Sequence, residues 1–284
     1  MRLLILGGSG MLGHQLWRGL HARHETWVTL RRPVTDFAAH QLFHEARAIQ
    51  VDDITDDTAL DQALGRVKPE AVINCVGLIK QRDEANDEAL ARRVNAEFPH
   101  RLAKRCGEIG ARLIHFSTDC VFAGTKGGYT ENDPPDATDL YGQSKLQGEV
   151  ADTHCVTLRS SVIGYELGTH LGLLGWFLNQ RGQTVNGYTR AIYSGFTTLE
   201  MARIVEQILT QHPALSGVWH VASEPISKFD LLVLCQAKLG WDGVIEPDDS
   251  FVCERSLNAE RFNAATGYTP PSWDTMISEL AHKP

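Results

Sequence analysis

The sequence predicts an α/β fold in which helices cover both faces of a doubly wound parallel sheet. Two observations support this prediction: apolar strands alternate with helical patterns as far as residue 164, and the first strand runs directly into a glycine-rich turn. After residue 164 the pattern changes to short helices among short strands, which predicts a smaller lobe of mixed α/β structure. The strands expected in the sheet are Arg2–Leu6, Thr26–Leu30, Ala48–Val51, Ala71–Val76, Arg112–Ser117 and Cys155–Leu158.

Composition narrows the class of protein. A chain of 284 residues with 43% hydrophobic content can bury a large core. Its formal net charge of −8 argues against nucleic acid as a partner, so a small molecule is expected. The six cysteines show no Cys-x-x-Cys pair, which favours free thiols over disulfides or a metal site. The opening apolar strand is too short for a signal peptide, and no later apolar run approaches about 18 residues, so we expect a cytoplasmic protein without a membrane partner.

The glycine-rich turn predicts a nucleotide site. Residues 7–13 read Gly-Gly-Ser-Gly-Met-Leu-Gly, with glycines at every third position. Glycines at this spacing allow a tight turn and let a pyrophosphate approach the amides at a helix N-terminus, where the helix dipole favours negative charge. The strand before and the helix after favour nucleotide binding over a purely structural turn. The residues expected at the cofactor are Gly7, Gly10, Met11, Leu12 and Gly13.

These features together indicate an NAD(P)-binding domain of the Rossmann type over residues 1–164 and a substrate-binding lobe over residues 165–284, with the two parts free to interleave. Arg31 and Arg32 follow the second strand, where an NAD-selective site usually carries an acidic residue. Two guanidinium groups suit a 2′-phosphate, so NADPH is favoured while NADH stays open. A solvated basic pair is the alternative interpretation of these arginines.

Further cofactor contacts are expected where other strands end. Asp53 and Ile54 follow the third strand and could meet the adenine, although a helix N-cap over residues 52–55 explains them equally well. Because the carboxyl ends of parallel strands meet at one edge of a sheet, the residues after the fourth and fifth strands should converge on the same crevice. These residues are Cys75, Val76, Gly77 and Ser117, with an ordinary loop glycine as the alternative for Gly77.

A tyrosine and a lysine four residues apart predict proton chemistry. Tyr141 and Lys145 would lie on one face of a helix, close enough for the ammonium to lower the pKa of the phenol from its usual value of about 10. Such a pair is common on helix surfaces by chance. It gains weight here because Thr118 and Asp119, at the end of the fifth strand, precede it by one loop. We therefore expect these four residues to be catalytic.

Taken jointly, these motifs resemble the extended short-chain dehydrogenase/reductase family and, within it, the dTDP-4-dehydrorhamnose reductase-like group. The resemblance covers nearly the whole chain and rests on residues 7–13, 94–95, 116–124, 141–145 and 158–161. It implies reduction by NAD(P)H of the keto group of a nucleotide-linked 4-keto-6-deoxysugar. In that reaction Thr118 would hydrogen-bond the carbonyl oxygen, Tyr141 would protonate it, and Lys145 would hold the nicotinamide ribose. The resemblance leaves a homodimer open.

The chain departs from this group at the end of the fifth strand. Members typically carry Ser-Thr-Asp-Tyr-Val-Phe-Asp-Gly, whereas Cys120 and Ala123 replace the tyrosine and the second aspartate here. The related dehydratases carry Thr-Asp-Glu, and without that glutamate the base for elimination is missing, so reduction is expected. Cys120 is expected to line the pocket and not to act as a nucleophile.

Substrate contacts are expected from the same strand end and from the C-terminal lobe. The candidates are Cys120, Val121, Phe122, Trp176 and Arg255. Trp176 could stack on a base or sugar or pack in the core, and Arg255 could meet a substrate phosphate or lie on the surface. Two other functions remain open: a nucleotide-sugar epimerase with tightly bound NAD, and a non-catalytic NADP-binding subunit similar to the regulatory subunit of methionine adenosyltransferase.

Overall fold

A seven-stranded parallel sheet forms the centre of the computed structural model, which describes residues 1–80 and 87–282. The order of its strands reverses between β1 and β4, which is the arrangement of a doubly wound sheet and confirms the predicted fold class. From one edge to the other, the strands are β11 (Gly217–His220), β6 (Cys155–Arg159), β5 (Arg112–Ser117), β4 (Ala71–Asn74), β1 (Arg2–Leu6), β2 (Glu25–Leu30) and β3 (Ala48–Gln50).

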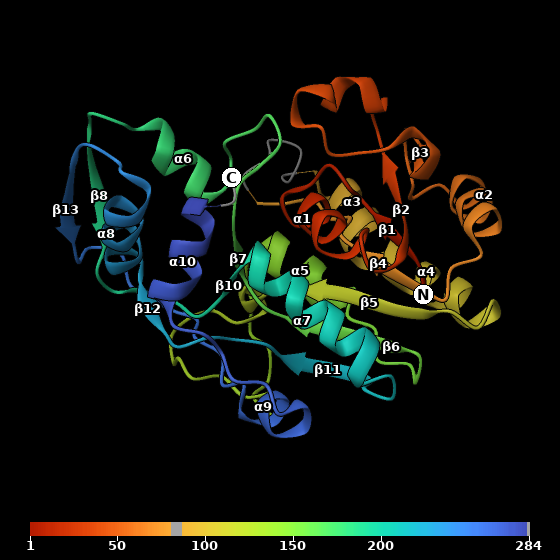
Figure 1. The fold of residues 1–284 in the computed structure, drawn as a ribbon. Helices are drawn as coiled ribbons and strands as arrows, with labels where there is room; N and C mark the ends of the chain where they lie inside the picture. Colours follow the sequence, from red (N-terminus) through yellow and green to blue (C-terminus); the bar gives the residue numbers. More distant parts are fainter. Residues whose placement is uncertain (81–86, 283–284) are drawn as a thin grey trace.

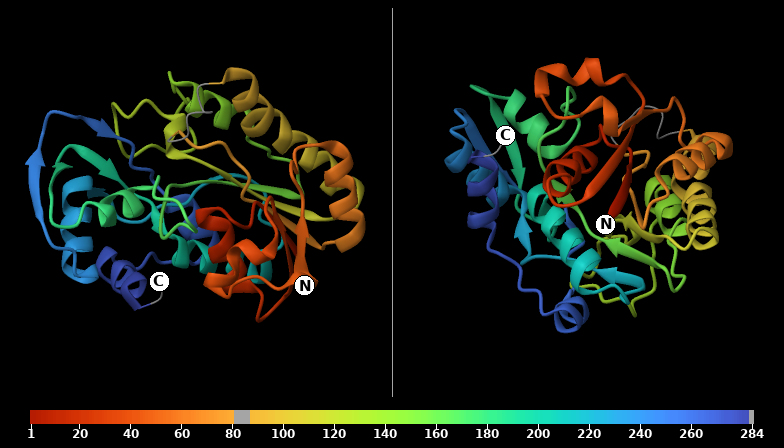
Figure 2. Two further views of the ribbon diagram at one scale, coloured as in Figure 1. Left: turned by 90° about the horizontal axis from the view of Figure 1, so that it is seen from above. Right: turned by 45° about the vertical axis from the view of Figure 1, so that its right-hand side comes forward.

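Helices cover both faces of this sheet (Figures 1 and 2). One face is covered by α1 (Met11–Leu20) and α7 (Thr198–Gln211). The opposite face is covered by α2 (Asp57–Val67), α4 (Phe98–Glu108) and α5 (Leu140–Gln147). Because strand side chains alternate between the two faces, Leu3 and Ile5 of β1 belong to one hydrophobic core, and Leu4 and Leu6 belong to the other.

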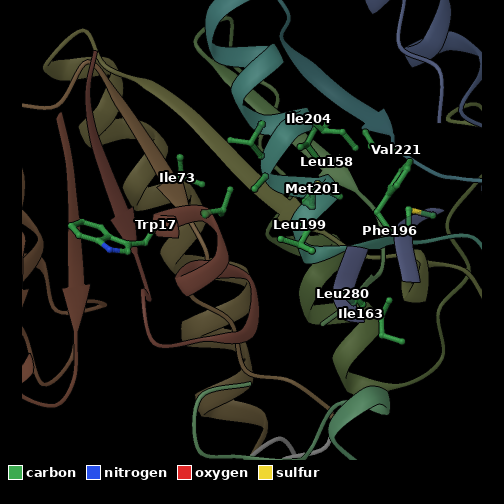
Figure 3. Close-up of a cluster of buried hydrophobic side chains, with 14 of the residues drawn as sticks. Trp17, Ile73, Leu158, Ile163, Phe196, Leu199, Met201, Ile204, Val221 and Leu280 are labelled. Atoms are coloured by element: carbon green, nitrogen blue, oxygen red, sulfur yellow. The ribbon is translucent and has the colours of Figure 1, made fainter. Parts of the chain in front are cut away.

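The larger core continues from the sheet into the C-terminal lobe. Figure 3 shows part of it, with Leu199, Met201 and Ile204 of α7 among side chains of the neighbouring strands. Thr197 caps α7 by accepting a hydrogen bond from the amide of Glu200 at 3.3 Å, and this helix packs against α1.

The lobe is built from short elements, as the sequence predicts. Its strands pair in three small sheets, β10–β7, β12–β9–β14 and β13–β8. The strands are β7 (Val162–Ile163), β8 (Thr184–Tyr188), β9 (Ala191–Tyr193), β10 (Phe196–Thr197), β12 (Ile226–Ser227), β13 (Val244–Asp248) and β14 (Cys253–Glu254). The helices are α6 (Leu173–Asn179), α8 (Lys228–Leu239), α9 (Glu260–Thr266) and α10 (Trp273–His282).

The two parts of the chain interleave. Strand β11 and helix α7 come from the sequence after residue 164, yet β11 extends the main sheet beside β6 and α7 packs against α1. The Rossmann unit therefore draws on both predicted segments, and the assignment of substrate binding to residues 165–284 stays a prediction.

One strand end differs from the expected elements. Strand β4 ends at Asn74 and not at Val76, because the Asn74 side chain accepts a hydrogen bond from the Val76 amide at 3.1 Å and turns the chain. Between β4 and β5, the described residues form α3 (Glu88–Ala91), a π-helical segment η4 (Arg92–Glu97) and α4. Short 3₁₀ turns are η1 (Val34–His40), η2 (Glu45–Arg47) and η5 (Asp119–Val121).

Across residues 1–80 and 87–282, no helix has both the length and the apolar character that crossing a membrane requires. All six cysteines are unpaired.

Candidate active site

A cavity of about 960 Å³ lies at the carboxyl ends of the central strands, between the sheet and the lobe. It adjoins the position where the strand order reverses, which is where open α/β sheets usually bind ligands. Its wall includes residues of the glycine-rich turn, of the β4 and β5 ends, of α5 and of the lobe. A second cavity, of about 740 Å³, lies among charged residues around Arg2, Lys68 and Arg105, and it brings together none of the predicted motifs.

The glycine-rich turn presents the start of α1 to this cavity. Gly10, Met11 and Leu12 line the wall, and no side chain of the described residues caps the N-terminus of α1. Gly7 and Gly13 do not line the wall but are required by the conformation of the turn. Gly7 has a φ of 78°, and a Cβ on Gly13 would lie 2.3 Å from the Gly7 carbonyl oxygen. The uncapped amides can therefore hold an anion, as the motif predicts.

Arg31 and Arg32 also line the cavity and are exposed. Arg32 lies 3.7 Å from the Asp36 carboxylate and stacks over the Phe37 ring, with its guanidinium carbon 5.0 Å from the ring centroid. The pair is therefore solvated and faces the pocket, and its contact with a 2′-phosphate stays a prediction.

The two residues expected at the adenine lie outside the cavity wall. Asp53 accepts hydrogen bonds from the Thr55 amide at 2.9 Å and from the Thr55 hydroxyl at 2.6 Å, and it pairs with Arg93 at 3.1 Å. Ile54 is buried in the core beneath α2. The local structural alternative accounts for both side chains in this structure, and their contact with a cofactor stays a prediction.

The loop after β4 reaches the cavity as expected. Cys75, Val76 and Gly77 line the wall beside Asn74. The loop is fixed by Asn95 of η4, whose side chain accepts from the Leu78 amide at 2.8 Å and donates to the Leu78 carbonyl at 3.0 Å. The same side-chain amide lies 3.2 Å from the Ser144 hydroxyl, so Asn95 connects this loop to α5.

The predicted catalytic residues meet at one side of the cavity. Ser117, Thr118 and Asp119 follow β5, and the Thr118 hydroxyl accepts from the Cys120 amide at 3.1 Å and donates to the Asp119 carboxylate at 3.0 Å. Helix α5 begins beside this turn, because Asp139 caps it through the Gly142 amide at 2.9 Å. Tyr141 and Lys145 of this helix line the same side of the cavity.

Close packing of α5 on the turn after β5 depends on Gly142. A Cβ at this position would lie 2.2 Å from the Cys120 carbonyl oxygen and 2.7 Å from the Ala137 Cβ. Real Cβ atoms do not come so close to other atoms, so only glycine lets the first turn of α5 lie against Thr118–Cys120.

The electrostatics of the pair differ from the sequence prediction. Burial raises the pKa of the Tyr141 phenol, and the Asp119 and Asp139 charges act in the same direction. Burial lowers the pKa of Lys145 to about 8, and its ammonium donates to the Phe116 carbonyl oxygen at 2.7 Å. The expected lowering of the Tyr141 pKa is therefore not found in this structure, where burial of the phenol has the largest effect.

On the lobe side, Arg255 and Cys120 line the cavity. The Arg255 Nε donates to the Phe122 carbonyl oxygen at 2.8 Å, and its Nη1 lies 3.4 Å from the Cys120 Sγ. Burial raises the pKa of the Cys120 thiol to about 12, so the thiol stays protonated and is a poor nucleophile near neutral pH.

The other three substrate candidates do not reach the cavity wall. Val121 and Phe122 are completely buried, and Phe122 stacks on Tyr129 with ring centroids 4.2 Å apart. Trp176 is 38% exposed on α6. Sequence position beside Thr118 suggested Val121 and Phe122, but both side chains fill a small core under the loop instead.

The structure adds a lysine that the sequence motifs did not indicate. Lys228 is the first residue of α8, and its Nζ lies 3.7 Å from the centroid of the Tyr193 ring, in the wall of the cavity. Burial lowers the pKa of Lys228 to about 8, while the Asp119 charge opposes that effect. Only the tertiary fold brings Lys228 to the site; the capping pattern at Ser227 could have located the helix start but not its position over the cavity.

Comparison with known proteins gives a consistent set of relatives. A family model described as RmlD substrate binding domain matches residues 1–282. The dTDP-4-dehydrorhamnose reductase of Streptomyces griseus is 35% identical over 151 residues, which are 53% of this chain and 44% of that protein. The beta subunit of methionine adenosyltransferase 2 from Bos taurus is 30% identical over 152 residues, 53% of this chain and 42% of that protein. These alignments thus span less than half of either relative.

Three other similarities extend further along the chain. The probable low-salt glycan biosynthesis reductase Agl14 of Haloferax volcanii is 29% identical over 237 residues, covering 79% of this chain and 75% of that protein. A hypothetical dTDP-4-dehydrorhamnose reductase from Sulfolobus tokodaii superposes with a TM-score of 0.79 at 26% identity, covering 96% and 98% of the two chains. A Bacillus anthracis dTDP-4-dehydrorhamnose reductase, solved with NADP, shares the fold with a TM-score of 0.81 at 19% identity, covering 100% and 98%.

Proposed function

Since the chain belongs to the RmlD substrate binding domain family, we propose that it is an NADPH-dependent oxidoreductase that reduces the keto group of a nucleotide-linked 4-keto-6-deoxysugar. One observation carries the proposal: Thr118, Tyr141 and Lys145 line the same cavity as the uncapped N-terminus of α1. A bound dinucleotide and a carbonyl substrate can therefore share one enclosed space.

The residues present fit a phosphorylated dinucleotide. The start of α1 can hold the pyrophosphate, and Arg31 and Arg32 can hold a 2′-phosphate at the same wall. When bound, NADPH would supply the hydride for reduction of the keto carbon. Lys145, whose pKa lies at about 8, is mostly an ammonium at neutral pH and can donate to the nicotinamide ribose.

Proton delivery falls to Tyr141 in this proposal. Its raised pKa keeps the phenol protonated at neutral pH, so it has a proton to give when negative charge develops on the carbonyl oxygen. The Thr118 hydroxyl lies in the same wall and can donate a second hydrogen bond to that oxygen. In the structure the single proton of this hydroxyl goes to Asp119 at 3.0 Å, so the hydroxyl must turn from Asp119 to the carbonyl oxygen in order to donate to it.

The lobe side of the cavity suits an anionic substrate. Arg255 and Lys228 bring two cations to this wall, and the half-exposed Phe251 lies at its edge. A diphosphate could contact the cations, while a base could stack on the aromatic ring.

The proposal is tested by following NADPH and NADH oxidation with a panel of nucleotide-linked 4-ketosugars and identifying the products by NMR. We expect oxidation only when a ketosugar is present, with a reduced sugar as the product. Conversion of a sugar without added reductant would identify an epimerase instead. Absence of turnover with every ketosugar would favour the alternative of a non-catalytic NADP-binding subunit, for which the similarity to the Bos taurus beta subunit is the reason to test.

Arg31→Ala combined with Arg32→Ala should separate the two cofactors. We expect the Kd for NADPH to rise by about tenfold or more, because each charge-assisted hydrogen bond to a phosphate contributes over 1 kcal/mol, whereas the Kd for NADH should change little. Fluorescence titration of both cofactors measures this difference. Arg92→Ala, which removes an exposed arginine of η4, is the control. Equal weakening of both cofactors would contradict the assignment of these arginines to a 2′-phosphate.

A further inference from the structure

A buried ion pair lies directly beneath the catalytic side of the cavity. Glu149 follows α5, and both of its carboxylate oxygens accept from Arg159, at 2.8 Å from Nε and 2.8 Å from Nη2. The two side chains are only 8% and 7% exposed. The Ser117 hydroxyl donates to the same carboxylate at 2.6 Å, so Glu149 links the ends of β5 and β6.

The network continues across the sheet. The Arg159 Nη1 lies 3.2 Å from the His220 Nε2, and the His220 Nδ1 lies 2.9 Å from the Tyr129 carbonyl oxygen. Since this carbonyl can only accept, Nδ1 donates and the neutral Nε2 accepts from Arg159. Each side chain of this hydrogen-bonded network, which runs from Ser117 through Glu149 and Arg159 to His220, therefore has a hydrogen-bond partner. The Glu149 carboxylate is held in one position as a result.

Lys145 lies next to this network. Its ammonium donates to the carbonyl of Phe116, the residue before Ser117, and it is buried. A buried ammonium is costly unless an anion is near. Among the described residues, Glu149 is the carboxylate that most favours the charged form of Lys145.

The other titratable groups facing Lys145 carry no charge near neutral pH. From the end of β4, burial raises the pKa of the Cys75 thiol, and from β5, burial lowers the pKa of His115 well below its usual value. Tyr141 on α5 itself stays protonated because its pKa is raised. In this part of the described structure Glu149 is thus the carboxylate that acts on the Lys145 charge, through its electrostatic effect and not through a direct ion pair.

We infer that Glu149 is a positioning residue of the active site, which keeps Lys145 in the ammonium form through its fixed carboxylate. The effect of Glu149 on turnover rests on the proposed reductase function, because the Lys145 charge matters for catalysis only if the protein is a reductase. The ionisation of Lys145 itself does not depend on that function.

Glu149→Gln tests this inference. Acetic anhydride is a small reagent that acetylates neutral amines. The rate of Lys145 acetylation is followed by mass spectrometry as a function of pH. Its pH dependence gives the titration midpoint of this lysine without cofactor or substrate. We expect the midpoint to fall by about one pH unit when the carboxylate is removed. General loosening of the structure would hydrate Lys145 and move its midpoint upward, so the direction of the shift distinguishes loss of the charge from loss of structure.

The matched control is Glu200→Gln. Glu200 is also buried, accepts from Tyr268 at 2.7 Å and pairs with Arg203 at 2.6 Å, but it lies on α7 away from the cavity. This variant should leave the Lys145 midpoint unchanged. If Glu149→Gln does not fold, the double variant Glu149→Gln with Arg159→Met removes the unpaired guanidinium; the midpoint should still fall, but by less, because loss of that cation favours the ammonium.

An unchanged or raised midpoint in the folded variant would overturn the inference. In steady-state assays, the alkaline limb of the kcat profile should move to lower pH by the same amount as the labelling midpoint. If the labelling shift is found but the native protein reduces no ketosugar, the proposed function fails while the link between Glu149 and Lys145 stands.

Discussion

Tyr141→Phe is expected to bind NADPH with the native affinity and to lose at least about 100-fold in kcat, because it removes the only proton that the phenol can give. The raised pKa of Tyr141 means that the native phenol is protonated throughout the neutral range, so the loss should be similar at every neutral pH. Cofactor titration by fluorescence and steady-state kinetics with the ketosugar identified in the panel measure the two quantities separately.

Tyr193→Phe is the matched control for this substitution. Tyr193 is buried and lines the same cavity, but among the described residues its hydroxyl has no hydrogen-bond partner. Its removal should therefore change kcat by no more than about twofold. Near-native turnover of Tyr141→Phe would exclude Tyr141 as the proton donor, and equal losses in both variants would indicate a general effect on the pocket.

Sequence reasoning found the sheet because its signals are local. The strand β1 and the turn at Gly7–Gly13 are adjacent in the sequence, so their pattern can be recognised directly. Parallel strands also bring their carboxyl ends to one edge of the sheet, independently of the length and conformation of the connecting loops. For the same reason Gly77 and Ser117 could be predicted in one crevice, whereas Tyr141 and Lys145 were predicted there from their helix spacing and from the single loop that separates them from Thr118.

Features that depend on tertiary packing were not predictable in the same way. Lys228 reaches the cavity only because α8 is carried there by the lobe, and β11 joins the main sheet across a long stretch of intervening chain. Phe122 lies close to Thr118 in sequence, but the turn η5 directs its side chain to Tyr129. The pKa of Tyr141 likewise reflects burial by distant residues, which spacing along a helix cannot reveal.

Gly142→Ala is expected to affect both stability and activity. The new methyl group would meet the Cys120 carbonyl oxygen at 2.2 Å, and neither that backbone nor the Ala137 Cβ can move independently of the site. Crowding of this kind typically costs about 1–3 kcal/mol of the free energy of unfolding. The first turn of α5 must then shift away from Thr118, and a displacement of about 1 Å can cost about 100-fold in rate. Urea unfolding and kcat measured on the same preparation test both effects.

Gly65→Ala provides the opposite case within the same protein. Gly65 lies inside α2, and a Cβ there would meet nothing within 4 Å, so the substitution should raise the free energy of unfolding by about 0.5–1 kcal/mol through the better helix propensity of alanine, with no change in kcat. Changes of opposite sign in the free energy of unfolding for the two substitutions would show that the effect at position 142 comes from contact with the Cys120 carbonyl. If Gly142→Ala were as stable and as active as the native chain, α5 could not lie against the turn after β5 as described, and the placement of Tyr141 beside Thr118 would have to be abandoned.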